Sequence, residues 1–264
     1  MNAHTAQFEL DAARMPGHWL LASLGKKVLR PGGIELTHDM IGQLRPGPRD
    51  DIVEFAPGMG ATARKLLAAG PRSYTGVDRD ASVVERLSAA LAEQGARFHA
   101  ASAEQTGLPG ESASIVIGEA MLSMQTKEQK ERIGAEAHRL LKAGGRYAIH
   151  ELALLPDDIA DSTRREIERE MSMNIHVGVR PLTAGEWRAF LENLGFTVEW
   201  RKLSPMHLLE PGRVLADEGL GGMLTILANV IRKPDARRRV LAMRSMFKRY
   251  ASHLSAVAFI ATKR

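Results

Sequence analysis

The chain has 264 residues, of which 44% are hydrophobic and 25% charged, as in an ordinary globular protein built around one large domain. It contains no cysteine, which excludes disulfides, a thiolate nucleophile and a zinc site held by cysteines. The formal net charge of +5 raises the question of an anionic partner such as nucleic acid.

Most of the excess positive charge lies in one stretch. Residues 232–249 hold eight Lys or Arg against one Asp. Within this stretch Val240, Met243, Phe247 and Tyr250 recur at helical spacing, which predicts an amphipathic helix with its basic residues on the solvated face. Because Phe247 and Tyr250 fall on the apolar face of this helix and no named nucleic-acid-binding motif occurs, a nucleic-acid partner is not favoured.

Membrane insertion and secretion are the next classes to consider. The apolar run at residues 19–24 is too short for a membrane span or for the core of a signal peptide. We therefore expect a cytoplasmic protein with no membrane partner, present as a monomer or a homodimer.

The first predicted elements are two helices. Residues 18–29 place Leu21, Leu24 and Val28 on one helical face, and residues 36–44 form a second candidate helix. Glycine and proline follow each of these segments and end the helical pattern.

Residues 51–80 contain the most informative pattern in the chain. An apolar run at 52–56 predicts a buried strand, and helix-forming residues fill 61–69. A second strand is predicted at 73–77 and ends at Asp78. The order strand, glycine turn, helix, strand, acid is half of a doubly wound nucleotide-binding sheet.

The turn between the first strand and its helix has the chemistry of a ligand cradle. Gly58 and Gly60 lack a Cβ, so the backbone can adopt positive φ and let a ligand lie against it. The helix that follows points its free N–H groups at the same place. Asp78 comes 20 residues after Gly58, and a carboxylate there can accept both hydroxyls of a ribose.

Two nucleotide ligands fit this pattern. The sequence from Gly58 to Ala63 matches G-x-G-x-x-A, which dinucleotide-binding folds also use. However, Glu54-Phe55-Ala56-Pro57-Gly58-Met59-Gly60 closely resembles motif I of class I S-adenosylmethionine-dependent methyltransferases. The resemblance implies that the backbone of Ala56, Pro57, Gly58 and Gly60 contacts the methionine part of that cofactor, and that Asp78 takes the ribose hydroxyls.

Later segments extend the resemblance. Leu140-Leu141-Lys142-Ala143-Gly144-Gly145-Arg146 resembles the family's LKPGG link into its fifth strand. Ser102-Ala103-Glu104 corresponds to the loop that contacts adenine, with Ser where the family usually has Asp. The cofactor-binding residues implied in this way are Glu54, Ala56, Pro57, Gly58, Gly60, Asp78, Arg79, Ser102, Ala103, Glu104 and Gly118.

The remaining elements complete an α/β chain. Strands are predicted at residues 96–100, 114–118, 146–152, 196–201 and 255–261, and helices at 81–93, 127–141, 162–173 and 184–194. Capping boxes at Thr126–Gln129 and Thr183–Glu186 mark the starts of two of these helices. The resemblance implies a doubly wound, seven-stranded Rossmann-like sheet of order 3-2-1-4-5-7-6, with a helical N-terminal segment and helical cap insertions.

The resemblance also divides the chain. We expect an N-terminal helical cover at 1–50, the cofactor-binding core at 51–153, a cap insertion at 154–182, more core at 183–202, a second helical cap at 203–253 and the last core strand at 254–264. Trp19, Arg30 and Thr37 either line the cover or only pack on the edge of the sheet.

Three residues are candidates for the catalytic role. Glu119 and His150 lie at the ends of predicted strands, where ligands bind in such folds, and His176 lies in the cap insertion beside Arg180. Because Leu154 stands where an H-E-x-x-H motif needs its second histidine, we expect no metal at His150-Glu151.

These observations predict an enzyme that transfers a methyl group in line from S-adenosylmethionine to a small, fairly apolar molecule. An RNA-modifying methyltransferase and a catalytically silent cofactor-binding module are the alternatives. A nicotinamide dehydrogenase is disfavoured, because the chain lacks a Tyr-x-x-x-Lys pair and a second catalytic domain. Whether oxygen, nitrogen, sulfur or carbon receives the methyl group stays open.

Overall fold

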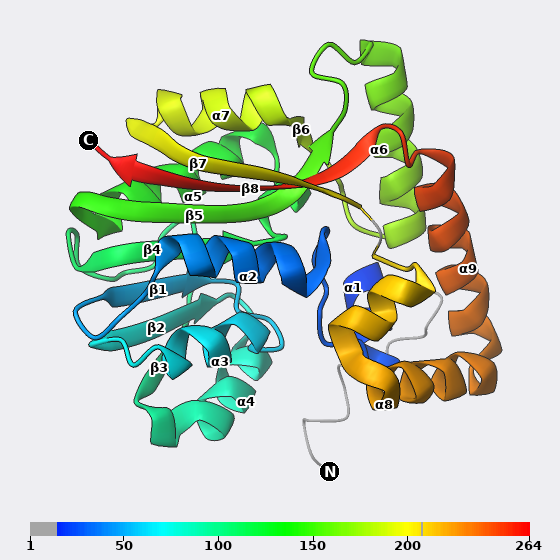
Figure 1. The fold of residues 1–264 in the computed structure, drawn as a ribbon, viewed down its shortest axis with the longest axis horizontal. Helices are drawn as coiled ribbons and strands as arrows, with labels where there is room; N and C mark the ends of the chain where they lie inside the picture. Colours follow the sequence, from blue (N-terminus) through cyan, green and yellow to red (C-terminus); the bar gives the residue numbers. More distant parts are fainter. Residues whose placement is uncertain (1–14, 207) are drawn as a thin grey trace.

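A central sheet organises the computed structural model, which describes residues 15–206 and 208–264 (Figure 1). Its strand order is β3-β2-β1-β4-β5-β8-β7, and a short strand, β6, pairs with β5 off this path. Strands β1 to β5 run parallel, whereas β8 lies antiparallel between β5 and β7. Since β7 and β8 are the sixth and seventh strands of the main sheet, the predicted order is confirmed.

The strands are β1 (Asp51–Phe55), β2 (Ser73–Asp78), β3 (Ala96–Ala100), β4 (Ala113–Glu119), β5 (Leu141–Leu154), β6 (Leu182–Thr183), β7 (Phe196–Pro205) and β8 (Leu254–Lys263). The α-helices are α1 (Gly17–Ser23), α2 (Gly33–Leu44), α3 (Ala61–Ala68), α4 (Ala81–Leu91), α5 (Lys127–Leu140), α6 (Asp161–Ile175), α7 (Ala184–Asn193), α8 (Pro211–Arg232) and α9 (Pro234–Arg249). Both predicted capping boxes are present, at the starts of α5 and α7.

Helices cover both faces of the sheet because its strands are apolar on both sides. Ile52 and Ile115 face the helices α2, α3 and α4, whereas Val53 and Val116 face α5 and α7. The two clusters lie on opposite sides because adjacent residues of a strand point in opposite directions. This is the arrangement of a parallel sheet buried on both faces.

A third apolar cluster lies beyond the sheet. Helices α1, α6, α8 and α9 gather at the carboxyl ends of the parallel strands (Figure 1). Their shared core includes Leu20, Leu24, Met171, Met243 and Phe247. Helix α1 of the predicted N-terminal cover and the helices of the two predicted cap segments therefore lie together at the edge of the sheet where ligands bind in such folds.

Two elements differ from the sequence-based prediction. Helix α1 ends at Ser23 rather than at residue 29, because Gly25 has a φ of 104° and breaks the helical path. Strand β5 begins at Leu141, which pairs with Ala113 of β4, and extends to Leu154, because β8 pairs with it along residues 146–154.

Helix α8 has an unusual surface. Gly219 interrupts it with non-helical angles, and Leu220, Leu224, Leu227 and Ile231 then form one exposed stripe. By length and composition alone the helix could cross a membrane, and no part of its most apolar stretch is buried. The basic helix predicted at residues 232–249 is observed as α9, with Met243 and Phe247 buried.

Two helical glycines test the packing of this fold. A Cβ on Gly134 of α5 would lie 2.3 Å from Leu194 Cδ1, whereas a Cβ on Gly42 of α2 would meet nothing within 4 Å. We expect Gly42→Ala to raise the free energy of unfolding by about 0.5–1 kcal/mol, because alanine is the better helix former. Gly134→Ala should be about 1–3 kcal/mol less stable than Gly42→Ala, because the added methyl group overpacks the contact between α5 and α7. Urea denaturation of both variants measures this difference, and equal stabilisation would contradict the packing.

Candidate functional site

The glycine turn after β1 has the backbone of a ligand cradle. Ala56, Gly58 and Gly60 have φ values of 51°, 53° and 74°. The nearest atom to a Cβ built on Gly58 is the carbonyl oxygen of Ala56 at 3.9 Å, so the space above Gly58 is open. A Cβ on Gly60 would instead lie 2.6 Å from Leu87 Cδ2. Gly58 thus leaves room for a ligand, and Gly60 allows α4 to pack closely behind the turn.

Asp78 lies at the carboxyl end of β2, beside this turn. One of its carboxylate oxygens, Oδ1, accepts the backbone N–H of Asp80 at 3.0 Å. Burial raises the pKa of Asp78 above its ordinary value, although hydrogen bonds from the backbone of Asp80 and Gly58 oppose the shift. Asp78 lines the same cavity as Ser102 and Ala103, so the residues predicted to hold ribose and adenine lie together.

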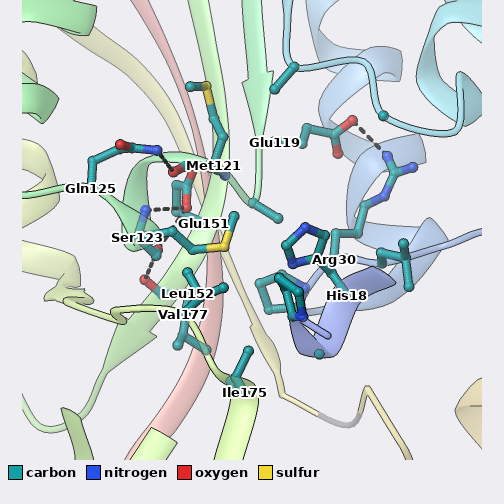
Figure 2. A pocket seen from close by; sticks show the side chains of 18 of the residues that line it. His18, Arg30, Glu119, Met121, Ser123, Gln125, Glu151, Leu152, Ile175 and Val177 are labelled. Atoms are coloured by element: carbon teal, nitrogen blue, oxygen red, sulfur yellow. Dashed lines mark hydrogen bonds and ion pairs between the residues drawn. The ribbon is translucent and has the colours of Figure 1, made fainter. Parts of the chain in front are cut away.

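The cavity has a volume of about 610 Å³ and two chemically different halves. One half is lined by the glycine turn, Asp78 and the loop after β3, and the other by apolar side chains of α6, α9 and the segment after β7. Figure 2 shows Met121, Leu152, Ile175 and Val177 across the cavity from His18. A ligand in one half can therefore reach a second ligand in the other.

These residues fit the cofactor that the sequence implies. The open backbone at Gly58 suits close contact with an extended chain, and the carboxylate of Asp78 is a hydrogen-bond acceptor for hydroxyls. In the part of the chain described, Glu54, Ala56, Pro57, Gly58, Asp78, Arg79, Ser102, Ala103 and Glu104 all line the cavity. Gly60 and Gly118 lie behind this lining.

Glu119, the first catalytic candidate, lies at the centre of a buried polar network. Arg30 Nη1 lies 2.6 Å from its Oε1, and Thr62 donates to the same oxygen at 2.5 Å. Thr37 donates to Oε2 at 2.5 Å, and His150 Nδ1 lies 2.9 Å from that oxygen. Figure 2 shows the ion pair with Arg30. Both carboxylate oxygens of Glu119 are therefore engaged.

The charge of Glu119 is set by this network. Burial alone would raise its pKa, but the charge of Arg30 and the hydrogen bonds from His150 and Thr37 outweigh burial and hold the pKa well below its usual range. Glu119 therefore stays ionised, and Arg30 supplies its counter-charge. The base role of Glu119 stays a prediction, whereas its contacts show a residue that holds the cover onto the sheet.

The two candidate histidines lie outside the cavity lining. His150 is fully buried between Glu119, Thr37 and the carbonyl oxygen of Pro31, so both ring nitrogens have partners. His176 is exposed at the end of α6, where it adopts the left-handed conformation with a φ of 58°. Their proposed contact with substrate stays a prediction that these positions do not favour.

Two residues of the cavity were missed by sequence reasoning. Glu151, a substrate-contact candidate beside His150 that is not among the predicted site residues, accepts the backbone N–H groups of Met121, Leu122 and Ser123 at 2.8–3.0 Å. It fixes the turn after β4. His18 lies in α1 and lines the cavity, yet no local motif marks it, because only the folded cover brings it there.

The second cap holds the cover in place. Glu218 Oε1 accepts the backbone N–H groups of Lys27 and Val28 at 2.8 and 2.9 Å. Asp217 accepts the backbone N–H of Ile34 at 2.9 Å and lies 3.2 Å from Lys26 Nζ. These bonds fix both ends of the segment that carries Arg30.

Comparisons with known proteins agree with this geometry. Residues 52–145 match the family model described as a methyltransferase domain. An uncharacterized protein of Haemophilus influenzae is 32% identical over 249 residues, which cover 93% of this chain and 96% of that protein. The uncharacterized methyltransferase YodH of Bacillus subtilis is 27% identical over 72% of this chain and 76% of its own length.

Among solved structures, the phosphoethanolamine N-methyltransferase 2 of Haemonchus contortus in complex with S-adenosyl-L-methionine is similar in fold. Its TM-score is 0.70 at 14% identity, over 99% of this chain and 58% of that one. The motif, the fold, the cradle and these matches agree: the chain belongs to the class I S-adenosylmethionine-dependent methyltransferases, and S-adenosylmethionine is its cofactor.

Proposed function

We propose that this methyltransferase acts on a small, largely apolar molecule. The observation that carries the proposal is the cavity itself, which runs from the glycine turn and Asp78 into an apolar half between α1, α6 and α9. Apolar pockets with a few polar groups are typical of small-molecule sites. A polymer would instead need an open charged surface beside the reacting atom.

The roles of the chain's residues follow from their positions. Bound S-adenosylmethionine supplies an activated methyl group on a positively charged sulfur. The glycine turn and Asp78 would hold that cofactor, and the cover and caps exclude water from the acceptor. Arg30 and Glu119 position the cover, because their ion pair joins the N-terminal segment to the end of β4.

The RNA-modifying alternative has less support. It would use the basic outer face of α9, but Arg238, Arg244 and Arg249 are each paired with an acidic residue. These pairs reduce the charge that the face could offer to phosphates.

The function is tested by measuring S-adenosylhomocysteine formation from S-adenosylmethionine with two acceptor panels. We expect product with apolar aromatic or isoprenoid hydroxy compounds and none with bulk transfer RNA. Product with RNA alone would contradict the proposal, and cofactor binding without product in either panel would favour the silent module.

Asp78→Asn tests the cofactor half of the site. We expect the variant to bind S-adenosylhomocysteine roughly 10- to 100-fold more weakly, because hydrogen bonds to a charged acceptor contribute about 1.5–3 kcal/mol. Calorimetric titration measures this affinity. Asp39→Asn is the control, since Asp39 is an exposed partner of Lys202 at 2.7 Å. If both variants bind S-adenosylhomocysteine with equal affinity, Asp78 does not contact the cofactor.

Glu54 gives a test based on pH. Burial raises the pKa of Glu54 from 4.5 to about 8, although a hydrogen bond from Tyr74 at 2.5 Å opposes the shift. The neutral carboxyl favours the folded state, so its contribution is complete below about pH 4.5 and is lost as the pH rises through about 8. Glu54→Gln removes this titration. We expect the unfolding free energy of the natural protein to fall relative to that of Glu54→Gln between these pH values, as measured by urea denaturation. Parallel pH profiles would show that Glu54 titrates normally.

The buried pair of Arg30 and Glu119 gives a test of stability. Arg30→Met should cost about 3–5 kcal/mol of unfolding free energy, because it leaves a buried carboxylate without its counter-charge. Adding Glu119→Gln should recover part of this loss. Arg72→Met is the surface control, because exposed pairs such as Arg72 and Asp51 contribute about 0–1 kcal/mol. Equal losses in both single arginine variants would contradict the positioning role.

A further inference from the structure

The cavity lining includes a buried polar group that has no partner among the described residues. Nδ1 of His18 is buried and makes no hydrogen bond to any residue that the structure describes. The ring lines the cavity and lies against Trp19, with the ring centroids 5.3 Å apart. An unpaired buried nitrogen of this kind is costly unless a ligand completes its hydrogen bonding.

The two carboxylates that lie near His18 already have hydrogen-bond partners. Glu119 is held by Arg30, Thr37 and Thr62, as described above. Glu151 accepts three backbone N–H groups and the Ser123 hydroxyl, the latter at 2.7 Å. Neither carboxylate is therefore free to receive a cationic acceptor.

The state of the His18 ring follows from its surroundings. Burial and the positive charge of Arg79 lower the pKa of His18 to about 4. The ring is therefore neutral near pH 7, and one of its nitrogens has a free lone pair. Across the cavity from it lie Met121, Leu152 and Val177, beside Glu151 and Ser123, whose side chains bond to each other (Figure 2).

We propose that His18 selects the acceptor by accepting a hydrogen bond from its hydroxyl or N–H group, and that the acceptor is a neutral, apolar molecule with one such donor. This inference rests on the proposed function, because an alcohol, a phenol or a primary or secondary amine carries a hydrogen on the atom that receives the methyl group. A charged amine is disfavoured, since both nearby carboxylates are paired and Arg79 adds positive charge.

Two neutral probes of the same shape test the inference without turnover. 2-Naphthol carries a donor hydroxyl, and 2-methylnaphthalene has a methyl group in its place. The ratio of their dissociation constants, measured by fluorescence titration, isolates the contribution of the donor. We expect His18→Leu to shift this ratio by about 2- to 10-fold against 2-naphthol, because a neutral hydrogen bond contributes about 0.5–1.5 kcal/mol.

Controls separate a lost hydrogen bond from a damaged fold. His18→Gln keeps an acceptor oxygen and should restore part of the preference. His99→Leu changes an exposed histidine of β3 outside the cavity lining and should leave the ratio unchanged. 2-Methoxynaphthalene, which can only accept a hydrogen bond, should respond to His18→Leu as 2-methylnaphthalene does.

The outcomes distinguish a wrong role for His18 from a wrong assignment of the cofactor site. An unchanged ratio in a folded His18→Leu variant would overturn the inference, as would a loss confined to 2-methoxynaphthalene. Failure of every probe to bind the natural protein would also overturn it, because an apolar cavity of this kind should accept them. Calorimetry with S-adenosylhomocysteine on the same samples tests the proposed function separately, and we expect its affinity to be unchanged by His18→Leu.

Discussion

The buried ion pair between Arg30 and Glu119 is the interaction on which the site depends. Arg30 belongs to the N-terminal cover and Glu119 to the end of β4, so this pair closes the cover over the carboxyl edge of the sheet. Thr37, Thr62 and His150 satisfy the remaining polar atoms, which is the condition for a buried charge pair to be tolerated. The backbone bonds that Asp217 and Glu218 accept hold the same segment from the opposite side. The cavity thus depends on contacts between distant parts of the chain.

The two sides of the cavity offer different chemical groups to a ligand. The sheet edge supplies a polar cradle of glycine backbone and one carboxylate, whose positions are fixed by β1 and β2. The cover and caps supply apolar walls and, among the residues that the structure describes, the unpaired imidazole of His18. Ala56 and Ala120, at the ends of the central strands β1 and β4, both have positive φ. Such conformations in residues other than glycine are costly and often occur at functional sites.

The sequence predicted the parts of the fold that local chemistry determines. The turn at Gly58 and Gly60, the position of Asp78 and the capping boxes of α5 and α7 depend on residues close together in the chain. Contacts between distant residues could not be predicted in this way. From the sequence, an acid at a strand end such as Glu119 suggests an available base. The folded chain shows that its carboxylate is paired with Arg30, which lies 89 residues away in the sequence. His18 belongs to no sequence motif. Its place in the cavity lining results from the packing of distant helices, so the sequence alone does not indicate a role for it.

A crystal structure of the protein with S-adenosylhomocysteine is the most direct test of this account. It should show the ribose hydroxyls on Asp78, the methionine chain along the open backbone at Gly58, and the sulfur facing the apolar half where His18 lies. A nucleoside bound elsewhere, or a cavity filled by Met59 and the cover so that no ligand enters, would contradict it.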